Sequence, residues 1–546
     1  MVILVPKTRV GNLRNQQSCR SLPRLRRVRH HTLLQTVCVA VPLVVSLVAV
    51  ASLVFRDYRK HGVDVRHINE DWVACRNSVP HWRLALTLYA SGLGSWILFA
   101  TPETGVMAGM WGLIGYGLGN ALPSWTLILV GPKVIQVLGP RGFSVTDFVL
   151  VRFGRSSQVF TALLTVFYNV IFISAELTGI SDCLSILIPG YPVYAAPLMI
   201  SVVTLAYSLL GGIRASYATD YIQAPLVFAV TVGAVVAFMV AVAPVEQSCF
   251  DAALKLSSAK GVAGGVTLLL SVTVNEFLNQ GLWQRFVSAR SFRDAAIGLS
   301  AAGLLSALTV ILFGFVGVVA LADALQPGSP PDAVDVVTSF PSGAFFMVIG
   351  QLGPAAAYST LVLAVLLSMS TVDTQQNAIM GLFVGEFSSA GWSLNWLRLL
   401  MVLFNVPAVA LAAAGRSVLE LFLVSNILSS ALVPPIFLGL SPALATPASF
   451  IVGSVSGLVS IVICGVSMTG SLSQGLTWFA LPFGAYDWRT LVTFVVVLLS
   501  SSTATVLAAQ IHFRLNPDMK AENRQRLADY HRPTEEGSSR ETASMC

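Results

Sequence analysis

Charged side chains are scarce in this sequence. They make up 11% of its 546 residues, against about 25% in a typical soluble protein. Hydrophobic residues reach 55%, and the mean hydropathy is +0.75. So little charge excludes an ordinary soluble protein, and we expect an integral membrane protein. Its net charge of +7 is accounted for by a basic N-terminus and by cytoplasmic loops, so it indicates no contact with nucleic acid.

The motifs of enzymes and metal proteins are also missing. The seven cysteines have neither CxxC spacing nor neighbouring histidines suited to zinc. No phosphate-binding loop, dinucleotide fingerprint, HExxH motif or nucleophile elbow occurs in a suitable context. All seven histidines lie in the tails or near the ends of predicted helices, so an intramembrane enzyme would lack a histidine base at depth. We expect no enzyme activity, no cofactor and no metal other than a coupling ion.

Long apolar segments make up most of the chain. A membrane-spanning helix needs roughly 20 predominantly apolar residues, and thirteen stretches qualify. They are 33–54, 84–104, 108–132, 157–181, 193–211, 218–243, 262–284, 295–321, 356–385, 394–414, 418–439, 447–468 and 490–511. The sequence therefore predicts an all-α polytopic membrane protein of about 13 transmembrane helices.

Lys and Arg are concentrated in alternate loops, and this orients the predicted helices because cytoplasmic loops carry the excess. With the loop after the first helix inside, the polar tail 512–546 is cytoplasmic. The basic, acid-free tail 1–32 then falls on the external side. This tail is a cleaved organellar presequence, a tail translocated regardless of its charge, or an over-extended gene start. The remaining alternative is that the segment 33–54 does not span the membrane. We take the plasma membrane as the default location and an organellar membrane as the alternative.

Two apolar segments carry residues that interrupt a helix. The run YASGLGSWILFATPE (89–103) contains two glycines and a proline, and segment 262–284 carries Glu276, Asn279 and Gln280 among further glycines. Close helix packing would explain the glycines, but not Glu276 beside Asn279. A broken helix is tolerated at membrane depth where its freed carbonyls line a cavity or bind an ion. Paired breaks predict an inverted-repeat transporter with a solute site at the midplane.

Four runs of residues, in order, resemble motifs of the sodium:solute symporter family. They are FSVTDFVLVRFGR (143–155), GGIRASYATDYIQ (211–223), NQGLWQRFVSARSFRDA (279–295) and SMSTVDTQQNA (368–378), within a resemblance that spans roughly 70–510. The resemblance implies a leucine-transporter-like core of five plus five helices over 84–439, with discontinuous first and sixth core helices. One helix precedes this core at 33–54 and two follow it at 447–511. It also implies secondary active transport of a small solute with sodium, sometimes with protons.

The same resemblance implies a sodium site. The family's ligands match the hydroxyls of Ser370 and Thr371 and the backbone carbonyls of Ala90, Leu93 and Leu367. Hydroxyl and carbonyl oxygens are hard ligands suited to such a cation. Some members place an aspartate where this chain has Gly92, and Asp373 could supply negative charge nearby.

Three further acidic residues lie in predicted helices. Asp220 matches the family aspartate at the inner end of the ion pathway, where it would assist cation release; the alternative is a carboxylate at a helix N-terminus. Glu176 and Glu276 could relay protons or hold a cationic group, or they could be neutral structural residues.

We expect a solute pocket bordered by Tyr89, Trp96, Asn279 and Gln280. No Lys or Arg lies within a predicted helix core, which favours a small neutral or cationic solute over an anion. The run NQGLWQR resembles urea active transporters, so urea is the leading solute; proline-like amino acids, polyamines and choline-like cations stay open. A solute sensor built on the same fold is the alternative from another functional class. The expected partners are the solute, Na⁺ or H⁺ and the lipid bilayer, with the oligomeric state undetermined.

Overall fold

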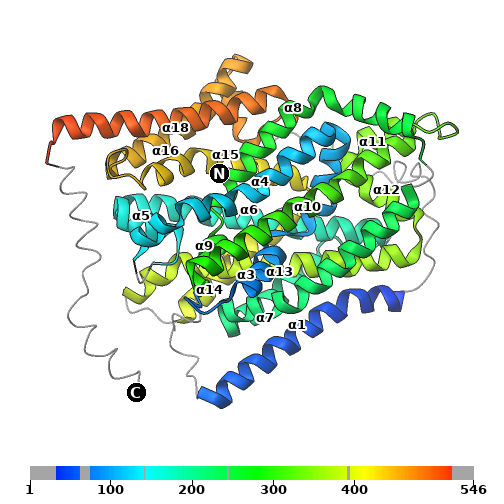
Figure 1. Cartoon of the computed structure of the whole chain (residues 1–546), viewed down its shortest axis with the longest axis horizontal. Helices are drawn as coiled ribbons and strands as arrows, with labels where there is room; N and C mark the ends of the chain where they lie inside the picture. Colours follow the sequence, from blue (N-terminus) through cyan, green and yellow to red (C-terminus); the bar gives the residue numbers. More distant parts are fainter. Residues whose placement is uncertain are drawn as a thin grey trace.

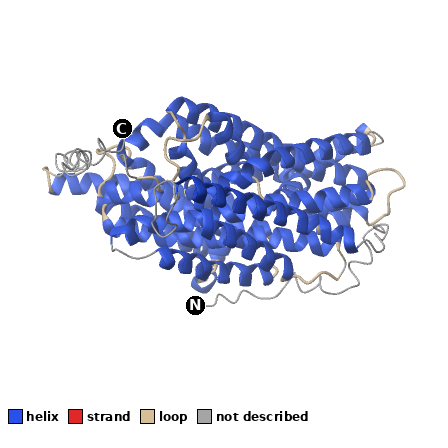
Figure 2. Cartoon of the chain, turned by 90° about the horizontal axis from the view of Figure 1, so that it is seen from below, coloured by secondary structure: helices blue, strands red, loops and turns tan. Residues whose placement is uncertain are grey.

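The computed structural model describes residues 32–61, 74–139, 142–188, 190–242, 245–389 and 394–518. Nearly all regular structure in these residues is helical, with a single isolated β-bridge between Val79 and Ala289. The helices run side by side as a bundle (Figure 1, Figure 2). This confirms the all-α class, whereas residues 1–31 of the predicted tail 1–32 and most of the predicted tail 512–546 lie outside the described residues.

The principal helices lie close to the predicted segments. Their bounds are α1 Thr32–His61, α3 His81–Gly92, α4 Ala100–Leu138, α5 Val145–Phe153, α6 Arg155–Leu187, α7 Ala195–Val242, α8 Gln247–Phe277, α9 Gln280–Ser288, α10 Phe292–Ala324, α11 Ala333–Ser339, α12 Ala344–Gln351, α13 Pro354–Ser389, α14 Leu394–Ala413, α15 Val418–Leu438, α16 Pro447–Thr469, α17 Leu472–Leu476 and α18 Trp488–Leu515. Three short 3₁₀ helices join them at η3 Ser95–Leu98, η4 Pro341–Gly343 and η5 Trp478–Ala480.

Several of these helices are long and apolar enough to cross a membrane. Within the described residues there are eight, or ten if each of two bent helix pairs forms one span. Two shorter apolar helices lie at Val37–Ser52 and Arg398–Ala413. The count supports an integral membrane protein, while thirteen spans and the five-plus-five repeat stay predictions.

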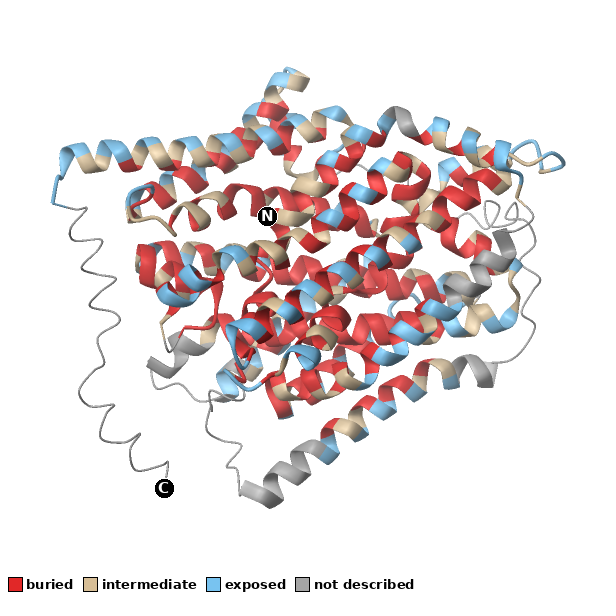
Figure 3. Ribbon diagram, viewed as in Figure 1, coloured by how far each residue is buried: buried red, intermediate tan, exposed pale blue. Residues whose placement is uncertain are grey.

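The outer surface of the bundle is apolar, as a lipid-facing surface requires. Leu129 is 82% exposed and Leu163 is 67% exposed, although both lie on long helices. Buried residues concentrate in the helices at the centre, and α1 and α18 at the periphery have more exposed positions (Figure 3). The polar residues discussed below therefore lie in the interior of the bundle, away from lipid.

The first predicted interruption is a true break between α3 and η3. Leu93 and Gly94 have extended backbone, with φ −111° and ψ 114° at Leu93. A side chain at Gly94 would overlap the carboxylate of Glu176 on α6. The break therefore depends on a residue without a Cβ at this position.

Two glycines bend long helices where the sequence predicts separate spans. Gly109, with φ 54°, lies inside α4 at the start of the predicted segment 108–132. Gly212, with φ 55°, lies inside α7 and follows the predicted segment 193–211. Positive φ is easily adopted by glycine alone, so these two positions allow each long helix to change direction.

The second predicted interruption separates α8 from α9. α8 ends at Phe277, and Asn279 caps α9 by accepting a hydrogen bond from the N–H of Gly281 at 3.0 Å. α9 then continues to Ser288. Arg285, which the sequence placed after a helix end in a cytoplasmic loop, therefore lies on a helix and is only 1% exposed.

The loop 322–355 contains α11, η4 and α12. α12 has eight residues, too few to span a membrane. Its aromatic side chains pack on the protein, with Phe346 5.0 Å from Phe99 and Phe345 5.6 Å from Phe313 between ring centroids. The apolar character of α12 is thus explained by packing against α10 and the segment after the first break.

Candidate functional site

The first break meets the polar run of α13 through one hydrogen bond. Thr371 Oγ1 donates to the carbonyl oxygen of Leu93 at 3.2 Å. Leu93 is the residue that ends α3, so its carbonyl is available to a partner outside its own helix. Ala90, in the last turn of α3, and Leu367, one turn before Thr371 on α13, are also buried. Hydroxyl and carbonyl oxygens of this kind fit a hard monovalent cation.

Ser370 makes a different contact from its neighbour Thr371. Its Oγ donates to Asp220 Oδ1 on α7 at 2.6 Å. Consecutive residues of a helix point about 100° apart, since 3.6 residues make one turn. The Ser-Thr pair therefore joins α13 to two elements: the first break through Thr371, and α7 through Ser370.

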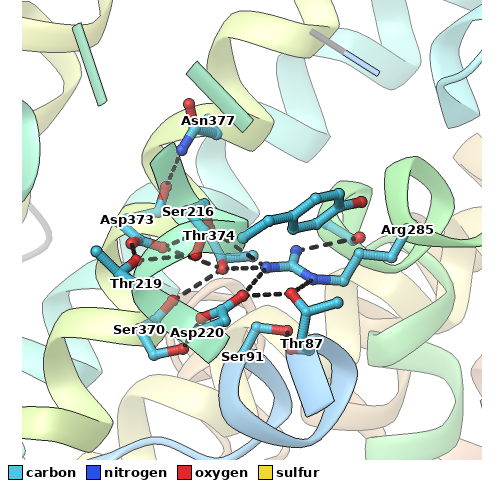
Figure 4. Close-up of polar contacts among 12 residues, drawn as sticks. Thr87, Ser91, Ser216, Thr219, Asp220, Arg285, Ser370, Asp373, Thr374 and Asn377 are labelled. Atoms are coloured by element: carbon cyan, nitrogen blue, oxygen red, sulfur yellow. Dashed lines mark hydrogen bonds and ion pairs between the residues drawn. The ribbon is translucent and has the colours of Figure 1, made fainter. Parts of the chain in front are cut away.

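Arg285 is the centre of a buried polar cluster that sequence reasoning missed (Figure 4). Its Nη2 lies 3.0 Å from Asp220 Oδ2 and 2.9 Å from Thr374 Oγ1, and its Nε donates to Thr87 Oγ1 at 3.0 Å. Thr87 in turn donates to Asp220. The Arg285 and Asp220 side chains are 1% and 0% exposed. A buried ion pair is tolerated only when hydrogen bonds satisfy its remaining groups, as they do here.

Asp373 extends this cluster toward α7. It accepts hydrogen bonds from Tyr207 at 2.6 Å, Ser216 at 2.9 Å and Thr219 at 3.2 Å. We name the whole group the Arg285 cluster. Its members are Thr87, Tyr207, Ser216, Thr219, Asp220, Arg285, Ser370, Asp373 and Thr374. With two carboxylates and one guanidinium, the ionised cluster has one excess negative charge, which favours a cation beside it.

The cluster overturns one expectation. Asp220 lies well inside the helix that follows Gly212, so the interpretation as a helix N-terminal carboxylate is wrong. The structure also places two basic residues from outside the predicted segments, Arg285 and Arg152, in the buried interior on helices. Arg152 donates to the carbonyls of Gly439 and Ala445 at 2.6 and 2.8 Å. A sequence signal for Arg285 did exist. If the predicted segment 262–284 is extended by four residues to 288, Arg285 lies on the same helix as Gly281, one turn after it.

Glu176 holds the first break from the opposite side. Its Oε2 accepts from the N–H of Ser95 at 2.8 Å and from Ser95 Oγ at 3.0 Å. Its Oε1 is buried and has no hydrogen-bond partner among the described residues. One carboxylate oxygen thus fixes the backbone after the break, while the other is unsatisfied.

Glu276 lines a cavity beside both breaks. The lining residues are Leu88, Ser91, Gly92, Asn120, Pro123, Ser124, Glu276, Asn279, Gly281, Leu282, Ala302, Gly303, Ser306 and Thr374. Asn279 Nδ2 donates to Glu276 Oε2 at 2.9 Å. This Glu276 cavity therefore contains one carboxylate, several hydroxyls and amides, and no basic residue in its lining.

Of the four residues expected to border a solute pocket, only Asn279 lines this cavity. Tyr89 contacts Thr309 through their hydroxyls at 3.1 Å, and Trp96 stacks on Tyr116 at 5.4 Å. Gln280 instead accepts from the N–H of Val145 at the start of α5 at 3.0 Å. Gln280 thereby ties α9 to α5 rather than facing the Glu276 cavity.

The sodium:solute symporter family profile matches residues 72–440, more than half of the chain. The chain belongs to this family. That confirms the resemblance inferred from the four sequence motifs. The family is a class of secondary transporters and not of enzymes, and it supports Na⁺-coupled solute symport as the activity of this symporter.

Three curated relatives of the symporter are named for different solutes. The spermidine transporter DUR31 of Candida albicans is 25% identical over 81% of this chain and 84% of its own length. The sodium/glucose cotransporter of Vibrio parahaemolyticus is 24% identical over 50% of this chain and 54% of its own. The urea-proton symporter DUR3 of rice, Oryza sativa subsp. japonica, is 28% identical over 28% and 20%.

Two solved structures share the fold. A Na⁺-coupled sialic acid symporter in an outward-open, substrate-bound state aligns with a TM-score of 0.69, at 15% identity over 88% of this chain and 98% of that chain. The nucleobase-cation-symport-1 transporter MHP1 aligns with a TM-score of 0.50, at 13% identity over 84% and 99%. At such identities the likeness is one of fold, and it agrees with the helical bundle described above.

Proposed function

We propose that this symporter couples the inward movement of Na⁺ to the uptake of a small polar solute by alternating access. The observation that carries the proposal is the hydrogen bond from Thr371 to the carbonyl of Leu93, at 3.2 Å across the first break. An interrupted helix that offers a carbonyl to a hydroxyl of a neighbouring helix provides the oxygen ligands that a dehydrated cation needs.

In this proposal Na⁺ binds between α3 and α13. Its ligands are the hydroxyls of Ser370 and Thr371 and the carbonyls of Ala90, Leu93 and Leu367. The Thr371 hydroxyl would turn from donating to Leu93 to offering its oxygen to the ion. Because the ion touches both helices, it stabilises the conformation in which they lie together, by its differential affinity for that state.

The number of membrane spans and their division into repeats are part of the same proposal. We propose thirteen spans, of which ten over 84–439 form two inverted repeats of five, with one span before and two after them. The breaks after α3 and after α8 support this division, since discontinuous helices in corresponding positions of two repeats border the solute site of such transporters.

For the solute we propose a small molecule rich in hydrogen-bond donors, neutral or cationic. Urea, the solute favoured by the sequence, and polyamines both meet this description, and relatives of the symporter are described as transporting urea and spermidine. A proline-like amino acid stays as an alternative, although its carboxylate would find no basic group in the lining of the Glu276 cavity.

Proton coupling is the second candidate for the driving ion. One relative is a urea-proton symporter, and four buried or partly buried carboxylates could carry a proton. They are Glu176, Asp220, Glu276 and Asp373. A solute sensor is the remaining alternative, and it would bind solute without accumulating it.

Uptake into proteoliposomes separates these candidates. The purified symporter is tested with labelled urea, proline, spermidine, choline and glucose, with an inward Na⁺ gradient, an inward proton gradient or neither. We expect accumulation of one solute above its equilibrium level only with the Na⁺ gradient. Accumulation driven by protons alone would replace Na⁺ as the coupling ion, and binding without accumulation under either gradient would identify a sensor.

A further inference from the structure

The negative charge of the Glu276 carboxylate adds to the partial negative charge at the end of its helix. Glu276 is in the last turn of α8, which ends at Phe277, and the C-terminal end of a helix dipole carries partial negative charge. Asn279 supplies the one hydrogen bond that this carboxylate accepts within the described part of the chain. Among the described residues no Lys, Arg or His forms an ion pair with Glu276. A positive charge is the group that this position lacks.

A buried hydroxyl close to Glu276 also lacks a partner. Tyr168 on α6 is 2% exposed, and its hydroxyl forms no hydrogen bond within the described part of the chain. It lies within electrostatic reach of Glu276. A buried polar group without a partner costs about 1–3 kcal/mol, so a ligand whose polar group bonded this hydroxyl would recover that cost.

Glu176 is a second carboxylate with an unsatisfied oxygen. Its Oε1 is buried without a partner. Tyr116 lies within electrostatic reach of both Glu176 and Glu276, and its ring stacks on Trp96. Two carboxylates without a cationic partner among the described residues are thus both within electrostatic reach of Tyr116. Aromatic rings pack against methylene groups and attract ammonium groups at their faces.

We propose that the solute is a linear alkylamine with at least two protonated amines. One ammonium group binds Glu276 and Tyr168, another binds Glu176, and the methylenes between them pack along Trp96 and Tyr116. This inference rests on the transport function proposed above and names its solute class. A neutral donor such as urea would satisfy the hydroxyls and amides but would leave both carboxylates without a counter-charge.

The test measures binding directly, by titration calorimetry on the purified full-length symporter in detergent. The probes are spermidine, the diamine putrescine, the monoamine butylamine and urea. We expect the parent to bind spermidine and putrescine more tightly than butylamine, and urea most weakly. Glu276→Gln keeps the shape of the side chain and removes its charge. We expect it to weaken spermidine binding by at least about 30-fold, since an ammonium group loses its buried counter-charge.

Two further variants separate the proposed contacts from general charge effects. Glu176→Gln should weaken the binding of spermidine and putrescine but leave butylamine unchanged, because a monoamine needs only one carboxylate. Glu420→Gln removes the same charge from an exposed position in the first turn of α15, and it should bind every probe as the parent does. Stabilisation of each variant by Na⁺ in a thermal unfolding assay reports that it is folded.

Several results would overturn the amine site. They are tighter binding of urea than of spermidine by the parent, spermidine binding to Glu276→Gln at the parent's affinity, or an equal loss in Glu420→Gln. Na⁺-driven uptake of a neutral solute together with any of these results would retain the transport function and remove the alkylamine. Conversely, Glu276-dependent amine binding without uptake under any gradient would retain the amine site and remove the transport function.

Discussion

The Arg285 cluster and the two glutamates beside the breaks both place charge in the interior of the bundle, yet their bonding differs. Asp220 has hydrogen bonds from Thr87, Ser370 and Arg285. Among the described residues, Glu276 accepts one hydrogen bond and one oxygen of Glu176 accepts none. The cluster supplies a counter-charge for Asp220 and donors for both of its carboxylates, whereas no cation among the described residues pairs with either glutamate.

This difference separates a structural role from a binding role. Completely bonded buried charges hold α3, α7, α9 and α13 in one arrangement, and the loss of any member leaves the others unsatisfied. Unsatisfied acceptors cost stability in the empty protein, and a ligand that provides donors recovers it. We therefore expect changes in the cluster to affect stability most, and changes at the glutamates to affect binding most.

The largest effect is expected from Arg285→Ala. The substitution leaves Asp220 buried without its cation, and breaking a buried ion pair costs about 3–5 kcal/mol of the free energy of unfolding. Thermal unfolding of the purified symporter measures it. Arg290→Ala is the matched control, because Arg290 pairs with Asp294 at 3.5 Å but its side chain is 63% exposed. Equal unfolding temperatures for the two variants would contradict a structural role for the cluster.

Glycine substitutions at the first break test the glutamate side of the comparison. In Gly94→Ala the new methyl group overlaps the Glu176 carboxylate, and overpacking of this kind costs about 1–3 kcal/mol. Gly92→Ala, two residues earlier, meets no atom within 4 Å and should leave the unfolding temperature nearly unchanged. Combining Gly94→Ala with Glu176→Ala should recover part of the loss. If the loss of stability in the double variant equals the sum of the losses in the two single variants, the overlap with Glu176 does not cause the destabilisation by Gly94→Ala.

Thr371 lies between the two regions, and its substitution tests the proposed ion site. Thr371→Ala removes one oxygen ligand, and the loss of a bond to a charged group costs about 1.5–3 kcal/mol, so the half-saturation concentration for Na⁺ should rise roughly tenfold or more. Thr371→Ser keeps the hydroxyl and should remain near the parent. Uptake measured against Na⁺ concentration decides, and an unchanged half-saturation in Thr371→Ala would remove this residue from the site.

The smallest effect is expected at an ion pair outside the spans. Asp487 accepts two hydrogen bonds from the Arg489 side chain, each at 2.9 Å, and these bonds hold the pKa of its carboxyl below the usual range. A lowered folded-state pKa contributes stability that is present above the unfolded pKa, about 3.9 for Asp, and is lost as the pH falls through the folded value. Asp487→Asn should therefore change the unfolding temperature slightly at neutral pH and not at all in strong acid. If the substitution changes the unfolding temperature more in acid than at neutral pH, the carboxyl of Asp487 does not stabilise the fold through a lowered pKa.

Prediction from sequence succeeded for features that the membrane environment requires, such as long apolar helices and polar residues at helix breaks. Apolar length located the long helices, and the glycines near residue 93 and the polar residues near 279 located both breaks. It failed at Arg285, because a helix end four residues too early assigned a buried cation to a loop. The expected solute pocket stays a prediction, although three of its four residues contact other parts of the protein: Tyr89 contacts Thr309, Trp96 contacts Tyr116 and Gln280 contacts Val145.

The sequence by itself determined the membrane class, the family and the breaks, because each depends on composition or on residues close together in the chain. Only the tertiary structure decided which polar residues meet. Arg285 and Asp220 are 65 residues apart and Ser370 is 150 from Asp220, so no local pattern predicts their contact. Buried charges must find partners wherever the packed helices bring them, and that packing separates the Arg285 cluster, which contains an ion pair, from Glu176 and Glu276, which have no cationic partner among the described residues.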